Sequence, residues 1–295
     1  MDQAEQLRNI IKAGNVKRSR PLARVITVTS GKGGVGKSNT AINLAIQFRK
    51  MGKKVVILDA DFGLANIEIM FGAVPKHNLS DLIYQGKNIK DIITWGPMEV
   101  GFISGGSGIT GLSNLSKDYL MYIVHNLAEL DTIADVIIVD TGAGISDAVL
   151  EFLVASGEIL LVTTPEPTSI TDSYSLLKAL NGHPGLERDN TQICMIANRV
   201  SSANEGEVLF QKLDVVVSRY LKLPITYLGA VPQDPLLAKA VMQQLPVSLQ
   251  NPQARSAQAY EEIAAKLMKQ DEGQNTQKRG VAAFFSHIIG KRNNG

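Results

Sequence analysis

The chain has 295 residues, of which 44% are hydrophobic and 20% charged, a composition typical of one large globular domain or two smaller ones. Its formal net charge of +2 is too small to indicate nucleic-acid binding by itself, and no apolar run reaches the roughly 18 residues that span a bilayer. The single cysteine, Cys194, excludes an internal disulfide, and no Cys/His cluster has metal-ligand spacing. The start of the chain lacks the basic and then apolar pattern of a secretory signal, so we expect a cytoplasmic protein.

The N-terminal region, residues 1–21, differs from the body of the chain. Residues 2–13 predict a short helix, because Leu7, Ile10 and Ile11 follow the i, i+3, i+4 spacing of one helical face. A basic linker that ends in a proline follows at residues 14–21.

From residue 24 onward, apolar β-branched runs alternate with helical stretches. The runs are mostly apolar throughout, which is typical of strands covered on both faces of a parallel sheet; they span residues 24–30, 54–61, 99–104, 135–141, 158–164, 191–198 and 225–231. After the first run, a glycine-rich turn leads into a helix that extends to about Met51. Further helical stretches lie at about 117–131, 146–156, 169–181, 205–221 and 254–270. This alternation predicts a single α/β domain over residues 22–270 with an open, doubly wound, mainly parallel sheet.

A glycine-rich loop follows the first predicted strand. It contains Gly31-x4-Gly36-Lys37-Ser38 between a predicted strand and a predicted helix, which is the context that a phosphate-binding P-loop requires. Its backbone N–H groups would cradle phosphate oxygens, helped by the partial positive charge of the helix N-terminus. We expect Lys37 to reach the β- and γ-phosphates and the Ser38 hydroxyl to coordinate Mg²⁺. The predicted nucleotide-binding segment is Gly31, Lys32, Gly33, Gly34, Val35, Gly36, Lys37, Ser38 and Asn39.

Lys32 directly follows the first glycine of this loop. The resulting KGGVGKS resembles the deviant Walker A motif of the MinD/ParA family of ATPases, and the resemblance extends over residues 22–270. It implies ATP and Mg²⁺ as ligands, an ATP-dependent homodimer and slow hydrolysis, with Lys32 crossing the dimer interface to the partner's phosphates. A cation supplied in this way stabilises transition-state charge as an arginine finger does, so hydrolysis would wait for dimerisation. The alternative is a solvated loop lysine.

Three carboxylates follow predicted strands, where ligands bind in open α/β sheets. Asp140 lies in IIVDTGAG, which resembles the family's Walker B motif and implies a water held on Mg²⁺. The resemblance places the hydrolytic water against Asp61, which would also reach Mg²⁺ through water, with Asp59 nearby. A carboxylate can orient water without being a strong base. The alternative is that these aspartates only cap helices.

The same resemblance implies further contacts to the nucleotide and to the second protomer. Residues 63–72 resemble the family's switch segment, whose Asn66 would reach the interface, and the Pro-Glu turn makes Glu166 a candidate for the ribose across the dimer. The alternative for Glu166 is a solvated turn carboxylate. Asn198 ends a predicted strand, and its amide can both donate to and accept from a purine edge. The segment AVPQD resembles the loop along the adenine face, which adds Pro232, Gln233 and Asp234.

The C-terminal region, residues 271–295, begins with a polar linker at 271–277 and then becomes apolar again. Five residues fall on one helical face, namely Val281, Phe284, Phe285, Ile288 and Ile289. Basic residues flank that face, namely Lys278, Arg279, Lys291 and Arg292. The pattern predicts an interfacial amphipathic helix and resembles the membrane-targeting tail of MinD-type proteins. One such tail is a marginal anchor, and a dimer with two tails gains avidity. The alternative is a helix docked on the protein's own core. The two interpretations are compatible if the helix is docked in the monomer and is released on dimerisation.

The first residues, DQAEQLR, match a DQAxxLR pattern. Within the MinD/ParA family this start resembles the FlhG subgroup of flagellar-number regulators, whose N-terminal helix stimulates the GTPase FlhF. The resemblance assigns partner contacts to Asp2, Gln3, Leu7 and Arg8, with Gln3 entering the GTPase site. The alternative is an amphipathic helix that packs on the body.

Together these features predict an ATPase switch that controls flagellar number and placement and cycles between the cytoplasm and the cytoplasmic face of the inner membrane. The expected partners are a second copy of the chain, FlhF and anionic lipids, with flagellar switch and transcription-regulator proteins as further candidates and no specific nucleic acid. Two rivals remain open: a MinD-type division-site ATPase, which does not explain the DQAxxLR start, and a ParA-type DNA-segregation ATPase, which would use the basic residues for phosphate contacts. A binding scaffold without turnover is disfavoured by Lys32 and Asp61 together.

Overall fold

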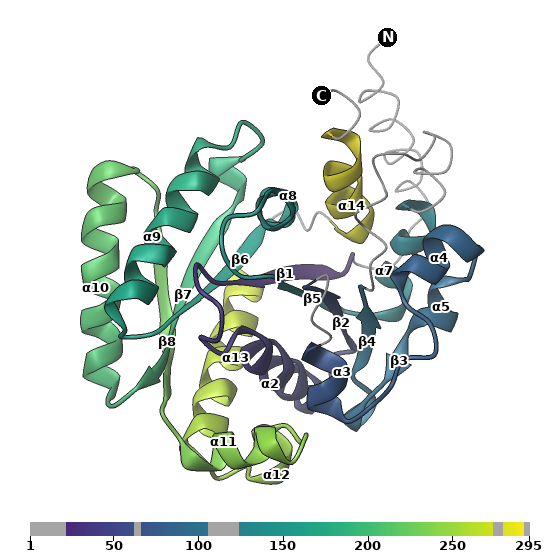
Figure 1. The fold of residues 1–295 in the computed structure, drawn as a ribbon, viewed down its shortest axis with the longest axis horizontal. Coiled ribbons are helices and arrows are strands. Elements are labelled where there is room, and N and C mark those ends of the chain that lie inside the picture. Colours follow the sequence, from purple (N-terminus) through teal and green to yellow (C-terminus); the bar gives the residue numbers. More distant parts are fainter. Residues whose placement is uncertain (1–21, 62–65, 106–123, 274–279, 292–295) are drawn as a thin grey trace.

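The computed structural model describes residues 22–61, 66–105, 124–273 and 280–291. In this part of the chain, the strands form one sheet in the order β3-β4-β2-β5-β1-β6-β7-β8, parallel throughout except for the pair β3 and β4 (Figure 1). The arrangement confirms the predicted doubly wound, mainly parallel sheet. The strands are β1 (Arg24–Thr29), β2 (Val55–Ala60), β3 (Thr94–Trp95), β4 (Gly101–Ser104), β5 (Val136–Thr141), β6 (Glu158–Thr163), β7 (Gln192–Val200) and β8 (Thr226–Pro232).

Helices cover both faces of this sheet. On one face α2 packs against α13, and on the other face α8, α9, α10 and α14 cover the strands (Figure 1). The helices are α2 (Lys37–Lys50), α3 (Asn66–Phe71), α4 (Leu79–Gln85), α5 (Ile89–Ile92), α7 (Leu130–Ile133), α8 (Asp147–Ala155), α9 (Pro167–Gly182), α10 (Ala203–Tyr220), α11 (Pro235–Met242), α12 (Val247–Gln250), α13 (Arg255–Gly273) and α14 (Gly280–Lys291), with 3₁₀ turns at Pro97–Glu99 and Arg188–Asn190.

The continuous apolar runs of the sequence are explained by this burial on two faces. In β2, for example, Val55 and Ile57 belong to the apolar cluster on the α2 side, whereas Val56 and Leu58 belong to the cluster on the α14 side. Every residue of β2 is buried. A strand that is covered on both faces needs apolar residues at consecutive positions, so a period-2 pattern is absent.

The edge of the sheet at β3 differs from the prediction. The expected strand at residues 99–104 begins at Gly101, after the 3₁₀ turn Pro97–Glu99. In that turn Met98 and Glu99 have φ angles of 53° and 57°. Arg49 holds the turn, because its Nε donates to the Met98 carbonyl at 2.8 Å and its guanidinium pairs with Glu99 at 2.8 Å. The two-residue strand β3 is too short to leave a periodic signal in the sequence.

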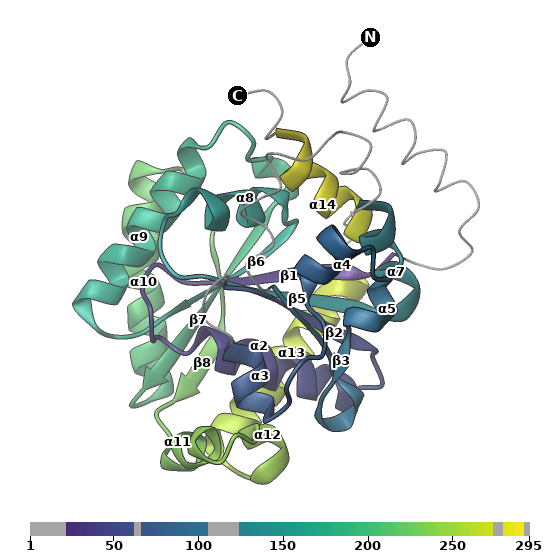
Figure 2. The ribbon, with the colours of Figure 1, turned by 45° about the vertical axis from the view of Figure 1, so that its right-hand side comes forward.

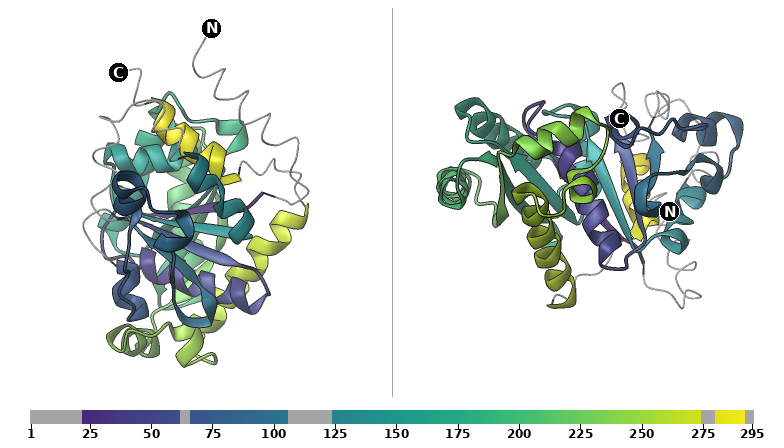
Figure 3. Two further views of the ribbon diagram at one scale, coloured as in Figure 1. Left: turned by 90° about the vertical axis from the view of Figure 1, so that its right-hand side faces the viewer. Right: turned by 90° about the horizontal axis from the view of Figure 1, so that it is seen from below.

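The C-terminal helix α14 lies over β1 between α8 and α7 (Figure 2). Its side chains at Val281, Phe284, Phe285 and Ile288 are buried there. The ring of Phe284 lies 6.0 Å from that of Phe152 in α8, measured between centroids. Helix α14 and helix α13 thus lie on opposite faces of the sheet (Figure 3). In the described residues no helix is long and apolar enough to cross a membrane.

Candidate nucleotide-binding site

The glycine-rich loop joins β1 to α2, which begins directly after Gly36. Gly36 has a left-handed φ of 98°, and a Cβ at this position would lie 2.2 Å from Nδ2 of Asn198. At the start of the loop, a Cβ on Gly31 would lie 2.2 Å from the backbone carbonyl carbon of Asp172 in α9. Both positions therefore require glycine. Gly36 needs the left-handed conformation and the space, whereas Gly31 needs only the space.

The loop presents its two lysines in different directions. Lys37, in the first turn of α2, is buried, and its charge acts on the carboxylate of Asp140. Lys32 is part-exposed at the rim of the loop. Gly33 and Gly34 are exposed between them, so their backbone N–H groups are accessible to a ligand.

Asp140, near the carboxyl end of β5, is the most buried acidic residue of the site. Neither of its oxygens has a hydrogen-bond partner of good geometry among the described residues. Burial raises the pKa of Asp140 to about 6, and this is the net result after the Lys37 charge and the nearby Ser38 hydroxyl have lowered it. An anion without full compensation in a buried place is stabilised by a cation or by water.

Asp59 lies beside Asp140, because the register of β2 and β5 pairs these two residues. Burial and the Asp140 charge raise the pKa of Asp59 to about 7, although the backbone N–H groups of Ile67 and Asp61 oppose the shift. Those two N–H groups donate to Oδ2 and Oδ1 of Asp59, each at 3.2 Å. Asp59 therefore braces the start of α3 against the end of β2.

Asp61, two residues farther along, faces the loop that follows β5. A Cβ on Gly142 would lie 3.4 Å from its Oδ1. Nδ2 of Asn66, the first residue of α3, donates to Oδ2 of Asp61 at 3.2 Å. Asn66, predicted to reach a second protomer, thus contacts the predicted water-orienting carboxylate within the same chain.

The residues present fit Mg²⁺ as a ligand. This ion takes oxygen ligands and keeps several waters, so a serine hydroxyl and carboxylates that act through water suit it. The hydroxyl of Ser38 lies close to the buried carboxylate of Asp140, and Asp61 lies near enough to influence its pKa. Among the described residues no group of His, Cys, Asp or Glu forms a complete metal cage by itself. An ion here would therefore share its coordination with phosphate oxygens and water.

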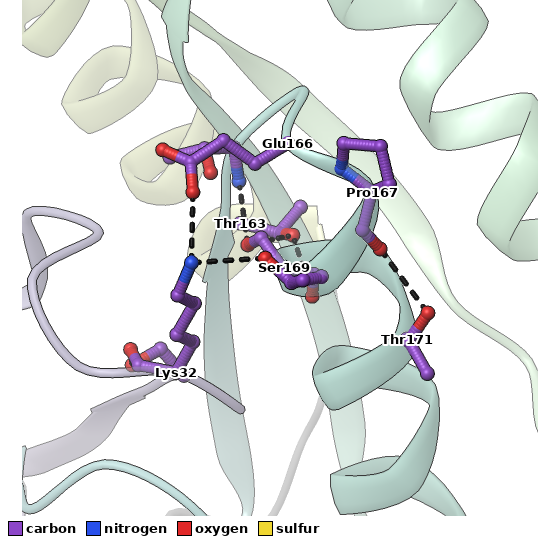
Figure 4. A network of polar contacts seen from close by, with 9 residues as sticks. Lys32, Thr163, Glu166, Pro167, Ser169 and Thr171 are labelled. Atoms are coloured by element: carbon purple, nitrogen blue, oxygen red, sulfur yellow. Dashed lines mark hydrogen bonds and ion pairs between the residues drawn. The ribbon is translucent and has the colours of Figure 1, made fainter.

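The exposed lysine of the loop is held by the first turn of α9 (Figure 4). Nζ of Lys32 donates to Oε2 of Glu166 at 2.8 Å and to Oγ1 of Thr168 at 2.9 Å. The hydrogen bond and charge of Lys32 lower the pKa of Glu166. The sequence predicts that both residues act across a dimer, and in this structure they bind each other within one protomer.

A hydroxyl network fixes the turn that carries Glu166 (Figure 4). The hydroxyls of Thr163 and Ser169 lie 2.9 Å apart, and Ser173 donates to Thr163 at 3.1 Å. The backbone N–H of Thr164 donates to Ser169 at 3.0 Å. These buried bonds tie the end of β6 to α9, so the position of Glu166 is set by the core.

Asn198, the predicted adenine contact, is buried behind the phosphate loop. Its Nδ2 donates to the Val35 carbonyl at 2.7 Å, and its Oδ1 accepts the N–H of Arg199 at 2.9 Å. Arg199 has a left-handed φ of 59°, which is strained for a residue other than glycine. The amide of Asn198 therefore shapes the loop, and a contact to adenine stays a prediction.

The segment that ends β8 carries the remaining predicted adenine contacts. Pro232 is the last residue of the strand, and the N–H of the exposed Gln233 donates to the Val200 carbonyl at 2.9 Å. The carboxylate of Asp234 accepts from the Leu236 N–H at 2.9 Å and from the Ser256 hydroxyl at 2.8 Å. Asp234 thus caps α11 and ties it to α13, and a nucleotide contact by its side chain stays a prediction.

Several predicted residues lie outside the described part of the chain. They are the partner contacts Asp2, Gln3, Leu7 and Arg8, the flanking residues Lys278, Arg279 and Arg292, and the side chains of Ile289 and Lys291. Conversely, the sequence gives no signal for Thr168, which binds Lys32, or for Asp131, which binds the start of α14. Both act through contacts between segments that are distant in the chain.

Comparisons of the sequence with known proteins indicate one family, and comparisons of the structure show the same fold. The ParA family model, described as "NUBPL iron-transfer P-loop NTPase", matches residues 21–268. The chain is 38% identical to the antiactivator FleN of Pseudomonas aeruginosa, over 83% of this chain and 86% of that protein. It is 32% identical to the flagellum site-determining protein YlxH of Helicobacter pylori, over 98% of both. The septum site-determining protein MinD of Pyrococcus horikoshii, solved with Mg-ADP, has the same fold, with a TM-score of 0.66 over 85% of this chain and 98% of that chain at 23% identity.

Proposed function

The chain belongs to the ParA family of P-loop NTPases, which are ATPases that use Mg²⁺, and on this premise we propose that ATP switches it between a monomer and a homodimer that controls flagellar number and placement. The similarity to FleN and YlxH supports the flagellar role. The alignment with YlxH also reaches into both tails, because it covers 98% of each chain.

Each residue of the site has a role in this proposal. The backbone of the loop and Lys37 bind the triphosphate, and Ser38 and Asp140 hold Mg²⁺ directly and through water. When bound, Mg²⁺ neutralises phosphate charge. Asp61 orients the attacking water, because its carboxylate lies near Asp140 and is already positioned by Asn66.

The observation that carries the switch is the different placement of the two lysines. Lys37 is buried beside Asp140 and serves the nucleotide of its own protomer, whereas Lys32 lies at the rim and is held by α9 through Glu166 and Thr168. A part-exposed cation at the edge of a phosphate site can reach a nucleotide in a second copy once its own partners release it. Hydrolysis then depends on dimerisation, because the second cation must neutralise transition-state charge.

The dimer is tested by light scattering with chromatography and by turnover measured against protein concentration. Lys32→Ala is expected to lose ATP-dependent dimerisation and turnover together. Asp61→Ala is expected to dimerise with ATP and not hydrolyse it. Lys212→Ala, at an exposed position of α10, is the matched control and should behave like the parent protein. Turnover per protomer that stays constant on dilution into the monomeric range would reject the switch.

We propose further that α14 exchanges between the domain and the membrane. Its apolar face, which is buried against β1 and α8, has the composition of an interfacial helix. Two tails in one dimer gain avidity, so membrane residence follows the nucleotide state. The test is co-sedimentation with anionic vesicles under ATP and ADP, with DNA in a parallel arm. ATP-dependent binding to vesicles is expected, and salt-sensitive binding to DNA alone would favour a DNA-segregation ATPase instead.

For the N-terminal segment we propose stimulation of an FlhF-type GTPase. The basis is the DQAxxLR start, which lies outside the described residues. A peptide of residues 1–20 should raise single-turnover GTPase activity, and Gln3→Ala should remove the effect. Flagellar counts in a deletion strain test the biological role, since misplaced division sites with normal flagella would point to a MinD-type function.

A further inference from the structure

One carboxylate on α7 binds both the start of the ATPase domain and the start of the C-terminal helix α14. Asp131 is buried and binds residues at the start of β1 and in the first turn of α14. Figure 2 shows α7 beside the start of α14. Its Oδ1 accepts the backbone N–H of Ala23 at 3.2 Å and that of Val281 at 3.1 Å. These two residues lie 108 positions before and 150 positions after it. A single oxygen atom therefore joins the start of β1, which follows residues 1–21, to the start of α14 in the C-terminal tail.

The two segments also contact each other directly. Gly280, the first residue of α14, has a left-handed φ of 64°. A Cβ at this position would lie 3.1 Å from both terminal carbons of Leu22 and 3.2 Å from Oδ2 of Asp131. Ala23 belongs to the same apolar cluster as Val281 and the buried phenylalanines of α14. The start of β1 and the start of α14 thus share one polar anchor and one apolar contact.

The rest of β1 makes its backbone hydrogen bonds with neighbouring strands and the segment before β5, although α14 also packs on the strand. The N–H of Arg24 donates to the Asp135 carbonyl at 2.9 Å, and from Arg24 onward the strand pairs with β5 and then also with β6. Loss of α14 would expose the Asp131 carboxylate to water, which competes for the Ala23 N–H, and would remove the packing of Leu22. The disturbance should therefore stop at Arg24.

We propose that Asp131 couples the two tails. When α14 leaves the domain, Ala23 loses its hydrogen bond to Asp131 and Leu22 loses its packing. A protein partner whose binding draws Leu22 and Ala23 away from Asp131 then has fewer contacts to break, so it binds more readily. Because coupling is reciprocal, a partner that draws on the N-terminal segment also favours the release of α14. The inference deepens the proposed function, in that attachment to a membrane through one tail would promote partner binding through the other.

Hydrogen exchange of the full-length protein, followed residue by residue by NMR, tests the coupling. Ile288→Asp places a charge in the buried face of α14, far along the helix from Asp131, and should undock the helix. Exchange at the Ala23 amide should then rise by about tenfold or more, because a hydrogen bond to a charged group is weakened. The amides from Arg24 to Thr29 should keep their protection. Phe285→Asp serves the same purpose if Ile288→Asp leaves α14 docked.

The controls separate coupling from general destabilisation. Val215→Asp makes the same kind of change at an exposed position of α10 and should leave the Ala23 amide unaffected. In an Asp131→Ala background, Ile288→Asp should change the exchange rate of the Ala23 amide by less than about twofold. In an Asp131→Asn background, which keeps an oxygen acceptor, Ile288→Asp should still produce most of its increase in that rate.

Two results would overturn the inference. One is full exchange throughout α14 with an unchanged Ala23 amide, and the other is faster exchange along the whole of β1. The experiment uses no nucleotide, lipid or partner, so a failure of vesicle binding or of GTPase stimulation would leave its outcome untouched.

Discussion

Replacing Asp59 by asparagine should change how the stability of the nucleotide-free protein depends on pH. The folded protein raises the pKa of Asp59 from 3.8 to about 7, because the carboxylate is buried and lies beside Asp140. The folded state thus binds a proton at Asp59 more tightly than the unfolded state does. This contribution to stability is fully present below pH 3.8 and is lost as the pH rises through about 7.

The magnitude follows from the two pKa values. Since one pKa unit corresponds to about 1.4 kcal/mol, Asp59 should lower the free energy of unfolding by about 2–3 kcal/mol between about pH 5 and about pH 8. Asp59→Asn removes this titration. The variant also weakens the bonds from the Asp61 and Ile67 N–H groups. The preference of those N–H groups for the charged carboxylate is already included in the folded-state pKa of about 7, so the change in stability across pH still reports the titration of Asp59.

Urea unfolding at several pH values, with a chelator to remove metal ions, measures this difference. The free energy of unfolding of the parent should fall more steeply toward pH 8 than that of the variant. Asp189→Asn, at an exposed position in the turn Arg188–Asn190, should follow the parent curve. Parallel curves for the parent and Asp59→Asn would refute the argument that burial and Asp140 hold a proton on this carboxylate.

Three further predictions concern the loop, the metal site and α14. Gly36→Ala should abolish binding of a fluorescent ATP analogue and lower the melting temperature, since its φ of 98° and the contact with Asn198 cost more than about 1 kcal/mol; an unchanged dissociation constant would contradict it. Binding of Mg·ADP near pH 6 should release protons from Asp59 and Asp140, whose pKa values are about 7 and about 6, and should release fewer protons near pH 8. Calorimetry in buffers of different ionisation enthalpy measures this release. Equal proton release at the two pH values would contradict the prediction. Phe284→Ala removes a buried ring, which costs about 3–5 kcal/mol if α14 stays docked. We therefore expect α14 to undock, so that its amides exchange rapidly with solvent while those of β5 stay protected. Retained protection in α14 would count against this.

The strands and long helices could be predicted because burial on two faces demands apolar residues in succession. The run at residues 135–141, for example, becomes β5 at Val136–Thr141. The order of the strands is a different matter, because it depends on which runs pair in space. The placement of Asp59 beside Asp140 follows from that pairing and from the register of β2 on β5. Sequence spacing predicts both residues near the site and does not predict that the Asp140 charge raises the pKa of Asp59.

The site itself divides in the same way. The loop from Gly31 to Ser38 is recognisable because its chemistry is local, whereas the pairing of Lys32 with Glu166 joins residues 134 positions apart. The amphipathic pattern of α14 suits a membrane and a protein groove equally well, so the pattern could not decide between them. In the structure the helix packs on β1, α8 and α7.

The apolar face of α14 packs on its own domain, so the helix can bind a lipid surface through that face only after it leaves the domain. If α14 binds membranes as proposed, the affinity for vesicles would be the difference between two burials of its apolar face, one among acyl chains and one against Phe152 and its neighbours. A synthetic peptide of the tail has no domain to pack on, so it should bind vesicles more tightly than the intact protein does. Conversely, a mutation in α8 that weakens the packing of α14 should strengthen binding to vesicles, although it changes no residue that contacts the bilayer.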